Sequence, residues 1–583
     1  MVAPTFNKPT DTNPGSSVMY GAPDLKYVLD VLDGSHATDR IQAEVIEGLQ
    51  QTFNSTVKPE GSNFVARNAN GTILYSGTSA QTALQTAFDQ GGHIYVGPGT
   101  YNTTTVLSVP SNTHIEADMN AVIRGAPAPN SHPLIRNSTA PTSPSIGNSY
   151  IILEGGTWDG NSADDSIPTT IGNTGNIHFH TCAFVWVNRV RSLNSVCEGI
   201  KVRSCDRAWI THCYVNRSKL ENDGSGKAGI MGSLINHECI IANNIVDDAG
   251  GEAIGQHTDC DRVIIANNVC RYRTNGRGYI LMEGTNNTTN EQIRDCVITG
   301  NTISSRYQCI HIISSKGVLI SNNSCTNVGA GDAVGQASAG GDGLRLVGHN
   351  QNITITNNYF HDLEHHGMLL TGSCRNLIIS DNLIRNVGRA AVDTYDGIRF
   401  SQGGSFNYEN VKITDNLIDD DRGTPRLRHG FFFDMNGHEI YNAWFTDNQV
   451  YNQTGNEFNF NWSTNDRFRN QTRFLNNSGI NSGRITNPFN NTHNEVGLAK
   501  GSTVTYSYAA APSASTLYTV VMSPIALTAT GGTGVSITVE DPGGNNMVTN
   551  ATTPLYNVYM QIGWRVNFGA FSAAPLVNVI AMS

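Results

Sequence analysis

The segment Val263-Ile-Ile-Ala-Asn-Asn-Val269 decides the fold, because variants of it recur along the whole middle of the chain. Each variant is an alternating, β-branched strand that ends in an asparagine at a polar turn. Aligned on this turn, the copies place one column of asparagines at Asn244, Asn268, Asn301, Asn323, Asn358, Asn382, Asn416 and Asn448. Successive members of the column are 22 to 35 residues apart, which is the self-similarity of a solenoid.

A second short strand belongs to each repeat, as in Gly343-Leu-Arg-Leu-Val347 and Gly397-Ile-Arg-Phe-Ser401. Two or three short strands cannot bury an apolar face alone, so we expect coils stacked about 4.8 Å apart around one core. The stacked asparagine amides should then hydrogen bond to one another inside a tight bend. Irregular spacing, without a leucine consensus or a Trp-Asp signature, argues against leucine-rich repeats and propellers.

Composition excludes several classes of partner. The 583 residues carry a formal charge of −11 and no basic cluster, so we expect no binding to nucleic acid. No apolar run approaches the roughly 20 residues that span a bilayer, so we expect no membrane segment. Met1–Thr12 lacks the pattern of a signal peptide.

The 11 cysteines all lie between Cys182 and Cys374 and show no CxxC spacing. This distribution is typical of small apolar wall residues, and it disfavours a disulfide framework, a zinc site or a redox role. Reduced, buried thiols indicate folding in a cytoplasm.

The open N-terminal end of a solenoid needs a cap. Ser79-Ala-Gln-Thr-Ala-Leu-Gln-Thr-Ala-Phe88 predicts a capping helix with Ser79 as N-cap and an apolar stripe on one face. The passage Ala80–Tyr101, followed by Ser111-Asn-Thr-His-Ile115, resembles the opening of the β-helix in phage tailspikes and related pectate-lyase-like proteins. The resemblance covers about residues 93–480 and implies a right-handed parallel β-helix.

We therefore expect an all-β chain in four parts. These are an N-terminal attachment arm (1–35), a helical neck and linker (36–75), the parallel β-helix (76–495) and a C-terminal antiparallel β-sandwich (496–583). The strong alternation of residues 503–508, 536–540 and 565–568 predicts the sandwich. The resemblance to tailspikes implies that this domain holds a trimer together or binds sugar.

The N-terminal parts carry two short helical patterns. The arm surrounds a small helix over Asp24–Leu32, and the neck helix has Ile41, Val45 and Leu49 on one face. A helix this short is marginal alone, so we expect the neck to pack on copies of itself in a homotrimer. The resemblance to tailspikes implies that residues 1–50 attach the protein to a virion or baseplate.

The second strands should alternate between the core and the outer surface. The expected inward residues are Ile254, Ile280, Ile310, Leu344, Met368, Ile398, Phe431 and Phe458. The outward set is rich in ionisable groups, which suit the hydroxyls and carboxylates of an elongated sugar chain. The expected substrate-binding residues are Arg345, Arg399, His311, Glu283, His257, Glu252 and Asp434. Phe432 is also outward, where it can stack on a sugar ring.

Asp342 and Asp396 are the expected catalytic pair. They occupy equivalent places two coils apart, so their backbones should be about 9–10 Å apart. That spacing suits an acid and a base that flank a glycosidic bond and a water, as in inverting glycosidases. His366 lies on the coil between them. The alternative interpretation is that each Asp-Gly is only a turn signal.

A lyase would use the same face differently. Arg345 or Arg399 would neutralise a uronic acid while His366 abstracts the proton. Arg207-Ala-Trp-Ile-Thr-His212 is similar to the Trp-Ile-Asp-His stretch of pectate lyases, but Thr211 replaces the aspartate that would help to hold calcium. The Asp-Pro-His motif of alginate epimerases is absent. We therefore predict neither a bound metal nor a cofactor.

The resemblance implies a trimeric tailspike that binds and cleaves a cell-surface polysaccharide, with hydrolysis favoured over β-elimination. It would fold in a cytoplasm and act from a virion tail. Two alternatives remain, a stand-alone extracellular polysaccharide lyase or hydrolase of a microbe and a non-catalytic receptor-binding fibre or adhesin.

Overall fold

The computed structural model describes most of residues 53–455 and the strands that follow. The gaps before residue 456 are 127–132, 139–146, 162–174, 219–226, 235, 259, 273–276, 285–292, 328–339, 402–406 and 435–439. Beyond it, the described residues are those of the strands from Phe458–Asn461 to Leu576–Ala581. The predicted arm and neck helix lie outside the described residues. No described helix is long and apolar enough to cross a membrane.

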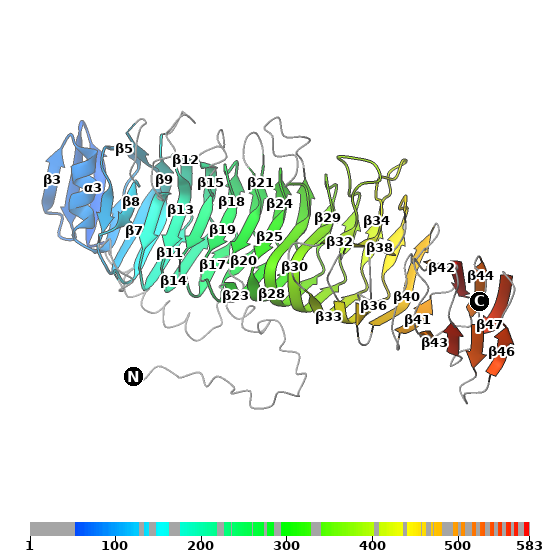
Figure 1. Cartoon of the computed structure of the whole chain (residues 1–583). Helices are drawn as coiled ribbons and strands as arrows, with labels where there is room; N and C mark the ends of the chain where they lie inside the picture. Colours follow the sequence, from blue (N-terminus) through cyan, green and yellow to red (C-terminus); the bar gives the residue numbers. More distant parts are fainter. Residues whose placement is uncertain are drawn as a thin grey trace, which may run out of the picture.

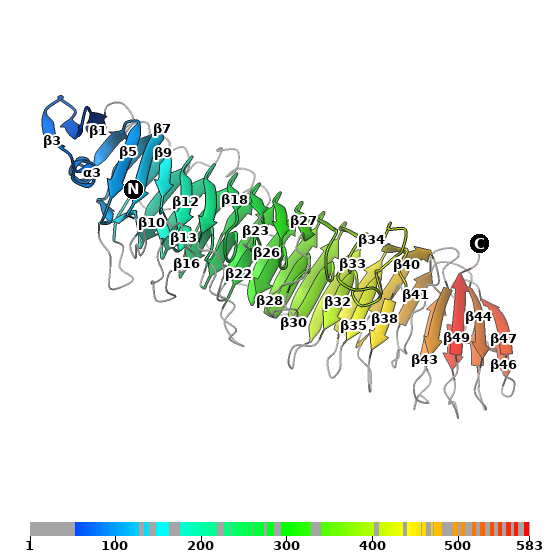
Figure 2. The ribbon, with the colours of Figure 1, turned by 90° about the horizontal axis from the view of Figure 1, so that it is seen from above.

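The described chain winds into a right-handed parallel β-helix, seen in Figure 1 and from above in Figure 2 as a row of stacked coils. Each coil contributes one strand to each of three sheets, here called sheets I, II and III. Sheet I holds the strands that precede the asparagine column. Its members are β4 (Gly92–Val96), β7 (Thr113–Gly125), β9 (Ile151–Asp159), β11 (Phe184–Asn188), β14 (Arg207–Thr211), β17 (Cys239–Ala242), β20 (Ile264–Ala266), β23 (Ile293–Thr299), β26 (Ser315–Ser321), β28 (Leu344–Thr356), β30 (Met368–Ser380), β33 (Tyr408–Thr414), β36 (Ile440–Thr446), β39 (Phe468–Arg469), β40 (Thr472–Ile480) and β41 (Asn494–Leu498).

Sheets II and III complete each coil. Sheet II, which follows the asparagines, holds β5 (Gly99–Thr103), the second halves of β7 and β9, β12 (Arg191–Ser195), β15 (Tyr214–Ser218), β18 (Ile245–Asp247), β21 (Val269–Arg271), β24 (Thr302–Ser305), β27 (Ser324–Asn327), β29 (Tyr359–His361), β31 (Leu383–Arg385), β34 (Leu417–Asp419), β37 (Gln449–Tyr451) and the end of β40. Sheet III holds β6 (Leu107–Val109), β8 (Ile135–Asn137), β10 (Gly175–His180), β13 (Glu198–Arg203), β16 (Ile230–Ser233), β19 (Ile254–His257), β22 (Ile280–Glu283), β25 (Ile310–Ile313), the first halves of β28 and β30, β32 (Ile398–Ser401), β35 (Phe431–Asp434) and β38 (Phe458–Asn461).

The predicted asparagine ladder is present and is buried. Asn323 Nδ2 donates to Asn358 Oδ1 at 2.9 Å and to the Ile298 carbonyl at 3.0 Å, and the same pattern repeats from coil to coil. The ladder also extends one coil further than predicted, because Asn448 Nδ2 donates to Asn477 Oδ1 at 2.9 Å. At its other end Cys213 takes the place of an asparagine, and its N–H donates to Asn244 Oδ1 at 2.8 Å.

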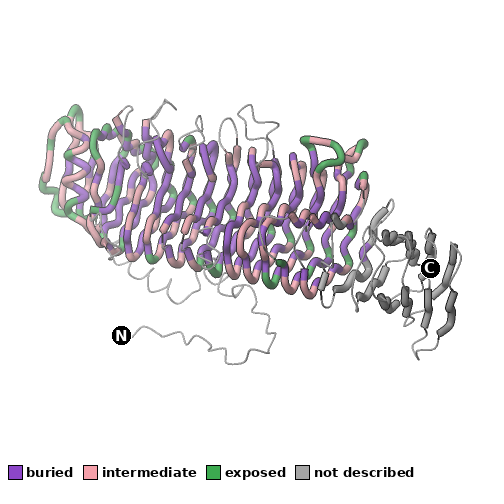
Figure 3. The backbone as a smooth tube through the Cα atoms, in the orientation of Figure 1, coloured by how far each residue is buried: buried purple, intermediate pink, exposed green. Residues whose placement is uncertain are grey.

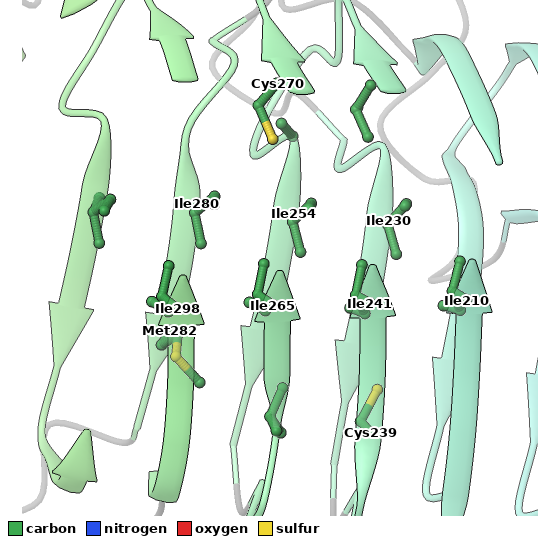
Figure 4. Close-up of a cluster of buried hydrophobic side chains, with 14 of the residues drawn as sticks. Ile210, Ile230, Cys239, Ile241, Ile254, Ile265, Cys270, Ile280, Met282 and Ile298 are labelled. Carbon is green, nitrogen blue, oxygen red and sulfur yellow. The ribbon is translucent and has the colours of Figure 1, made fainter. Parts of the chain in front are cut away.

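The core is a continuous column of branched aliphatic side chains. Figure 4 shows Ile210, Ile241, Ile265 and Ile298 of sheet I stacked in register opposite the isoleucines of sheet III, and Figure 3 shows the same burial along the coils. All 11 cysteines are buried and unbridged, as expected of wall residues.

The N-terminal cap is larger than predicted. The helix α3 (Ala80–Phe88) begins where expected, since the Ser79 hydroxyl accepts the Thr82 N–H at 3.2 Å and the predicted apolar stripe is buried. The predicted linker, which ends at residue 75, instead contains the strands β1 (Ser55–Glu60) and β2 (Asn63–Asn68) and the start of β3 (Ile73–Gly77). β1 pairs in parallel with β4, so it covers the open edge that the linker prediction would have left exposed.

The C-terminal region has the antiparallel strands that the sequence predicted. One sheet has the order β42 (Thr503–Ser507), β49 (Leu576–Ala581), β44 (Ile525–Thr530) and β47 (Leu555–Met560). In the other, β43 (Thr516–Val520) and β45 (Ile537–Glu540) flank β48 (Arg565–Phe568), and β46 (Asn546–Asn550) pairs with β45.

Candidate functional site

The outer face of sheet III carries the ionisable residues predicted from the sequence. All eight residues predicted to point inward are fully buried in the core, with exposures of 0 to 1%. The strand register places Arg345, Leu369, Arg399 and Phe432 side by side on successive coils, at the outward position between two core residues. The predicted in–out alternation of this sheet is therefore correct.

Four polar residues stand in a row just before the sheet III strands. The N–H groups of Gly343, Gly367 and Gly397 donate to the carbonyls of the residues one coil further on, at 3.0, 3.2 and 2.9 Å. These bonds put four residues at equivalent positions on consecutive coils. The row is Asp342, His366, Asp396 and His429. His366 thus lies between the two aspartates, as the repeat predicts.

Asp342 is a buried carboxyl without a tight cationic partner among the described contacts. Its side chain is 2% exposed, and Oδ1 accepts the His366 backbone N–H at 3.2 Å. Burial raises the pKa of Asp342 to about 6, against the opposing charges of Arg345 and Arg399. A carboxyl poised near neutral pH is suited to donating a proton to a leaving group.

His366 is held as the neutral imidazole. Burial, together with the positive charge of Arg399, lowers the pKa of His366 well below its ordinary value. Its Nδ1 accepts the backbone N–H of Asp396 at 2.9 Å, which leaves the proton on Nε2. In this state His366 can donate one hydrogen bond through Nε2 but does not offer Nδ1 as a base.

Asp396 differs sharply from Asp342. Both of its oxygens accept hydrogen bonds from Arg428, at 2.9 and 2.7 Å, and the residue is 0% exposed. Arg399 adds a third cationic contact at 3.8 Å. Burial raises the pKa of Asp396 against the opposing effect of Arg428, yet this two-bond geometry is that of an ionised carboxylate. Such an arrangement is suited to fixing Arg428 and His366 in place.

Arg399 and Phe432 take part in the same cluster. Arg399 donates to Asp434 Oδ2 at 2.9 Å, and the guanidiniums of Arg399 and Arg428 lie over the Phe432 ring, 4.9 and 4.5 Å from its centroid. Phe432 is consequently only 6% exposed. The prediction that it stacks on a sugar ring is therefore wrong for this conformation, because the two arginines already cover the ring.

Three residues near Asp342 were not predicted. His365 stacks on Tyr395, with ring centroids 4.4 Å apart, and the His366 ring meets the same phenol edge-on at 5.2 Å. Burial raises the pKa of Tyr395, as do the charges of Asp342 and Glu364, so both carboxylates lie within electrostatic reach of one phenol. Burial, with the charge of Arg345, lowers the pKa of His365 to about 4.

The remaining predicted residues form a second group nearer the N-terminus. His257 Nδ1 lies 2.9 Å from Glu283 Oε2, and Tyr279 donates its hydroxyl proton to Glu252 at 3.0 Å. Burial alone would lower the pKa of His257, but Glu283 and Glu252 together raise it. Accordingly, the bond with His257 lowers the pKa of Glu283.

His311 links the two groups. In the sheet III register it lies between Leu281 and Arg345, and its Nδ1 is 2.9 Å from Gln308 Nε2. Burial and the charge of Arg345 lower the pKa of His311 to about 4. The face is thus continuous from Glu252 to Asp434. Among the described residues, no group of three His, Cys, Asp or Glu side chains is arranged to hold a metal ion.

Comparison with known proteins agrees with the fold. Residues 280–478 match the family described as a right handed beta helix region. No curated protein matches the sequence. Similar solved structures include the surface adhesin PfbA of Streptococcus pneumoniae, at 15% identity over 65% of this chain and 89% of the adhesin, with a TM-score of 0.45.

Two phage proteins are also similar. Gene product 12 of bacteriophage phi29 is 15% identical over 79% of this chain and 68% of its own, with a TM-score of 0.47. Tailspike protein 3 of bacteriophage CBA120 is 13% identical over 78% of this chain and 71% of its own, with a TM-score of 0.46.

Proposed function

We propose that the outer face of sheet III binds a cell-surface polysaccharide and that Asp342 serves as the general acid that cleaves it by glycoside hydrolysis. The observation that carries this proposal is the environment of Asp342. Its carboxyl is buried on a long polar face and its pKa is raised to about 6, so it is about half protonated at pH 6 and still about one-tenth protonated at pH 7.

Hydrolysis with inversion needs a second carboxylate to activate water. Asp396 is poorly suited to that role, since Arg428 occupies both of its oxygens. We assign Asp396 to positioning His366 and Arg399 instead. Glu364 is our candidate for the second carboxylate, because its side chain lies against Gly341, the residue directly before Asp342. Glu364 is also buried, with Arg389 Nε at 3.7 Å from its Oε1.

The rest of the face is proposed to orient the polymer. Arg345, Arg399 and Asp434 would bind sugars around Asp342, whereas Glu252, His257, Glu283 and His311 would bind units further along the chain. Imidazole and carboxylate groups bond well to hydroxyls, and arginine also accommodates a uronic acid. We further propose that the protein is a homotrimer on a virion tail, with residues 1–50 as its attachment.

A non-catalytic fibre is the second candidate. The specific observation in its favour is that several charged groups on the face already pair with one another, as in Arg399 with Asp434 and His257 with Glu283. Such pairs can form a fixed surface for hydrogen bonding to sugars without any chemical step.

One assay separates these functions. The protein is incubated with purified capsule, O-antigen and uronate polymers, and both reducing ends and ultraviolet absorbance are recorded. Reducing ends alone indicate the proposed hydrolase, and an absorbing unsaturated product indicates a lyase. A polymer that binds tightly but yields neither product contradicts the enzymatic proposal and supports the fibre.

Variants test the assigned roles. Asp342→Asn should reduce turnover by at least about 100-fold, the size of a general acid's contribution, and should leave polymer binding intact. Glu364→Gln should behave in the same way. Full activity in Asp342→Asn would refute the site, whereas full activity in Glu364→Gln alone would remove only the second assignment.

A further inference from the structure

A cluster of cationic and imidazole side chains lies on the outer face of sheet III, toward its N-terminal end. In the strand register, His178 stands between Arg136 of β8 and Lys201 of β13. Two residues further along the same strands, His180 stands beside Arg203. The residues that alternate with them are buried in the core, so all five side chains point outward. We call these five residues the basic patch.

The basic patch concentrates positive charge in a small area of an acidic protein. Adjacent coils are about 4.8 Å apart, and alternate residues of one strand are about 7 Å apart. Among the described contacts, the patch pairs with one carboxylate, that of Glu198, whose Oε1 lies 3.3 Å from Lys201 Nζ. Arg136 and Arg203 form no ion pair and donate no side-chain hydrogen bond in the described part of the chain. Two guanidinium charges therefore have no described counter-charge, although the whole chain carries −11.

The basic patch also has unused hydrogen-bonding capacity. Arg203 Nε and His178 Nε2 are buried and have no hydrogen-bond partner among the described residues. An unsatisfied buried polar atom costs free energy that a ligand can recover. Arg136 is exposed, and both histidines and Arg203 are half-buried, so the patch reaches the surface. An oxyanion fits this arrangement, because a guanidinium donates two parallel hydrogen bonds to a carboxylate or a phosphate.

The two histidines respond to this positive charge. Burial lowers the pKa of His178 to about 3, and the charges of Lys201 and Arg203 act in the same direction. Burial and the same two charges lower the pKa of His180. No carboxylate is among the main causes of either shift. At neutral pH both imidazoles are therefore uncharged hydrogen-bonding groups that lie beside fixed cations.

We infer that the basic patch binds an oxyanion, carboxylate or phosphate, of an acidic polysaccharide that lies along sheet III. Arg136 and Arg203 pair with the oxyanion, and the imidazoles bond to the sugar hydroxyls beside it. This inference rests on the proposal that sheet III binds a polysaccharide, and it adds the substrate class, because the polymer must be anionic.

The basic patch and the proposed catalytic residue lie on the same face. β13 and β28 are five coils apart, or about 24 Å. Figure 2 shows β10, β13 and β16 in one row with β32 and β35. The patch therefore anchors the polymer at a distance from Asp342 and has no part in the chemical step.

Chemical modification of the polymer tests the inference. Purified capsule and O-antigen polymers are immobilised, and binding of the full-length protein is measured. Each polymer that binds is measured again after reduction of its carboxyl groups to alcohols, or after removal of its phosphates with hydrofluoric acid. One treatment should weaken binding about tenfold or more, and which one does so distinguishes carboxylate from phosphate. Binding that survives both treatments, or binding to neutral polymers only, would overturn the inference.

Variants locate the effect at the basic patch. Arg136→Gln combined with Arg203→Gln should weaken binding of the untreated polymer about tenfold or more and leave binding of the treated polymer unchanged. The matched control combines Arg191→Gln with Arg217→Gln, which removes two exposed charges from sheet II, and should bind both polymers as the wild type does. No loss in the patch variant, or an equal loss in the control, would overturn the inference.

Folding and catalysis are separated from this result. Neither patch arginine has a described partner, so the double variant should keep the wild-type unfolding midpoint. If the midpoint falls, the exposed Arg136→Gln alone should still weaken binding, and its failure to do so would overturn the inference. Cleavage of a neutral polymer would overturn the inference and leave the role of Asp342 standing. Binding of an acidic polymer without cleavage would do the reverse, and a protein that binds no polymer would contradict both.

Discussion

At the scale of single residues, the two aspartates of the polar face differ more than their sequence contexts do. Both precede a glycine and a sheet III strand. Asp342 has a buried carboxyl whose charged form is disfavoured, whereas Asp396 is locked to Arg428. The difference arises from the loop before β35, which brings Arg428 to one coil and not to the other.

Asp342→Asn should stabilise the protein at neutral pH. The folded-state pKa of about 6 lies above the ordinary value of 3.8, so the folded state binds the proton more tightly and wild-type stability falls as the pH rises from about 4 to about 6. Asp342→Asn has no carboxyl to ionise at this position, so it does not show this fall in stability. Its gain should approach about 3 kcal/mol above pH 7 and vanish below pH 4, which denaturant midpoints at both pH values would show. Equal midpoints at pH 7 would mean that the carboxyl is solvated in the folded state.

Removal of one partner of the Asp396–Arg428 pair should destabilise the fold. Asp396→Asn leaves a guanidinium partly buried without its counter-charge, a change that costs about 3–5 kcal/mol in buried pairs. The double variant Asp396→Asn with Arg428→Met should recover part of that loss. Measured unfolding free energies that simply add for the two changes would argue against a coupled pair.

The sequence predicted the regular part of the site but not the irregular part. Asp342, His366 and Arg345 follow from the register, since each lies on or just before a strand whose alternation is visible in the sequence. Arg428, Tyr395 and Glu364 lie in loops. A loop has no in–out alternation, so its sequence does not indicate which side chain points toward the outer face of sheet III. The sequence signals these loop residues only through a dense run of charged and aromatic residues before a strand, such as Arg426-Leu-Arg-His429.

At the scale of elements, the asparagine ladder is the best-defined source of order. Asn323 accepts the N–H and the Nδ2–H of Asn301 and donates to two further oxygens, all in a buried bend. A second ladder runs on the surface, where Asn376 Nδ2 donates to Asn352 at 2.7 Å. The two ladders use one side-chain type at very different burial.

Asn323→Ala should therefore lower the free energy of unfolding far more than loss of one exposed asparagine of the surface ladder. It leaves buried donors and acceptors unsatisfied, and at about 1–3 kcal/mol each we expect a total loss of about 3 kcal/mol or more. Asn376→Gly, which keeps the left-handed backbone of an exposed rung, should cost less than about 1 kcal/mol. Thermal unfolding of both variants provides the measurement, and similar losses would show that burial does not set the ladder's contribution.

The cap illustrates where element-level prediction failed. α3 was predicted because its capping serine and apolar spacing are local signals. β1, β2 and β3 were not predicted, because three strands joined by tight turns in a short polar stretch resemble a linker. What distinguishes them from a linker is the parallel pairing of β1 with β4. Pairing between distant segments leaves no local trace in the sequence.

At the scale of the whole molecule, the fold was predictable because one pattern repeats. Each copy reinforces the register of the next, so a single column of asparagines assigns the interior and the exterior of many coils. The sequence contains no comparable repeated pattern that would predict how the chains assemble. The trimer remains a prediction, and light scattering coupled to size exclusion should give three times the chain mass of 62.9 kDa. A mass equal to one chain would contradict it.

The pH dependence of cleavage tests the central claim most directly, because it reports the protonation of Asp342 itself. With a polymer that the protein cleaves, kcat/KM should fall above an apparent pKa of about 6, since the general acid then loses its proton. Asp342→Asn should show no comparable limb in any residual activity. A rate that stays constant or rises from pH 6 to pH 8, or a limb that persists in Asp342→Asn, would contradict the assignment.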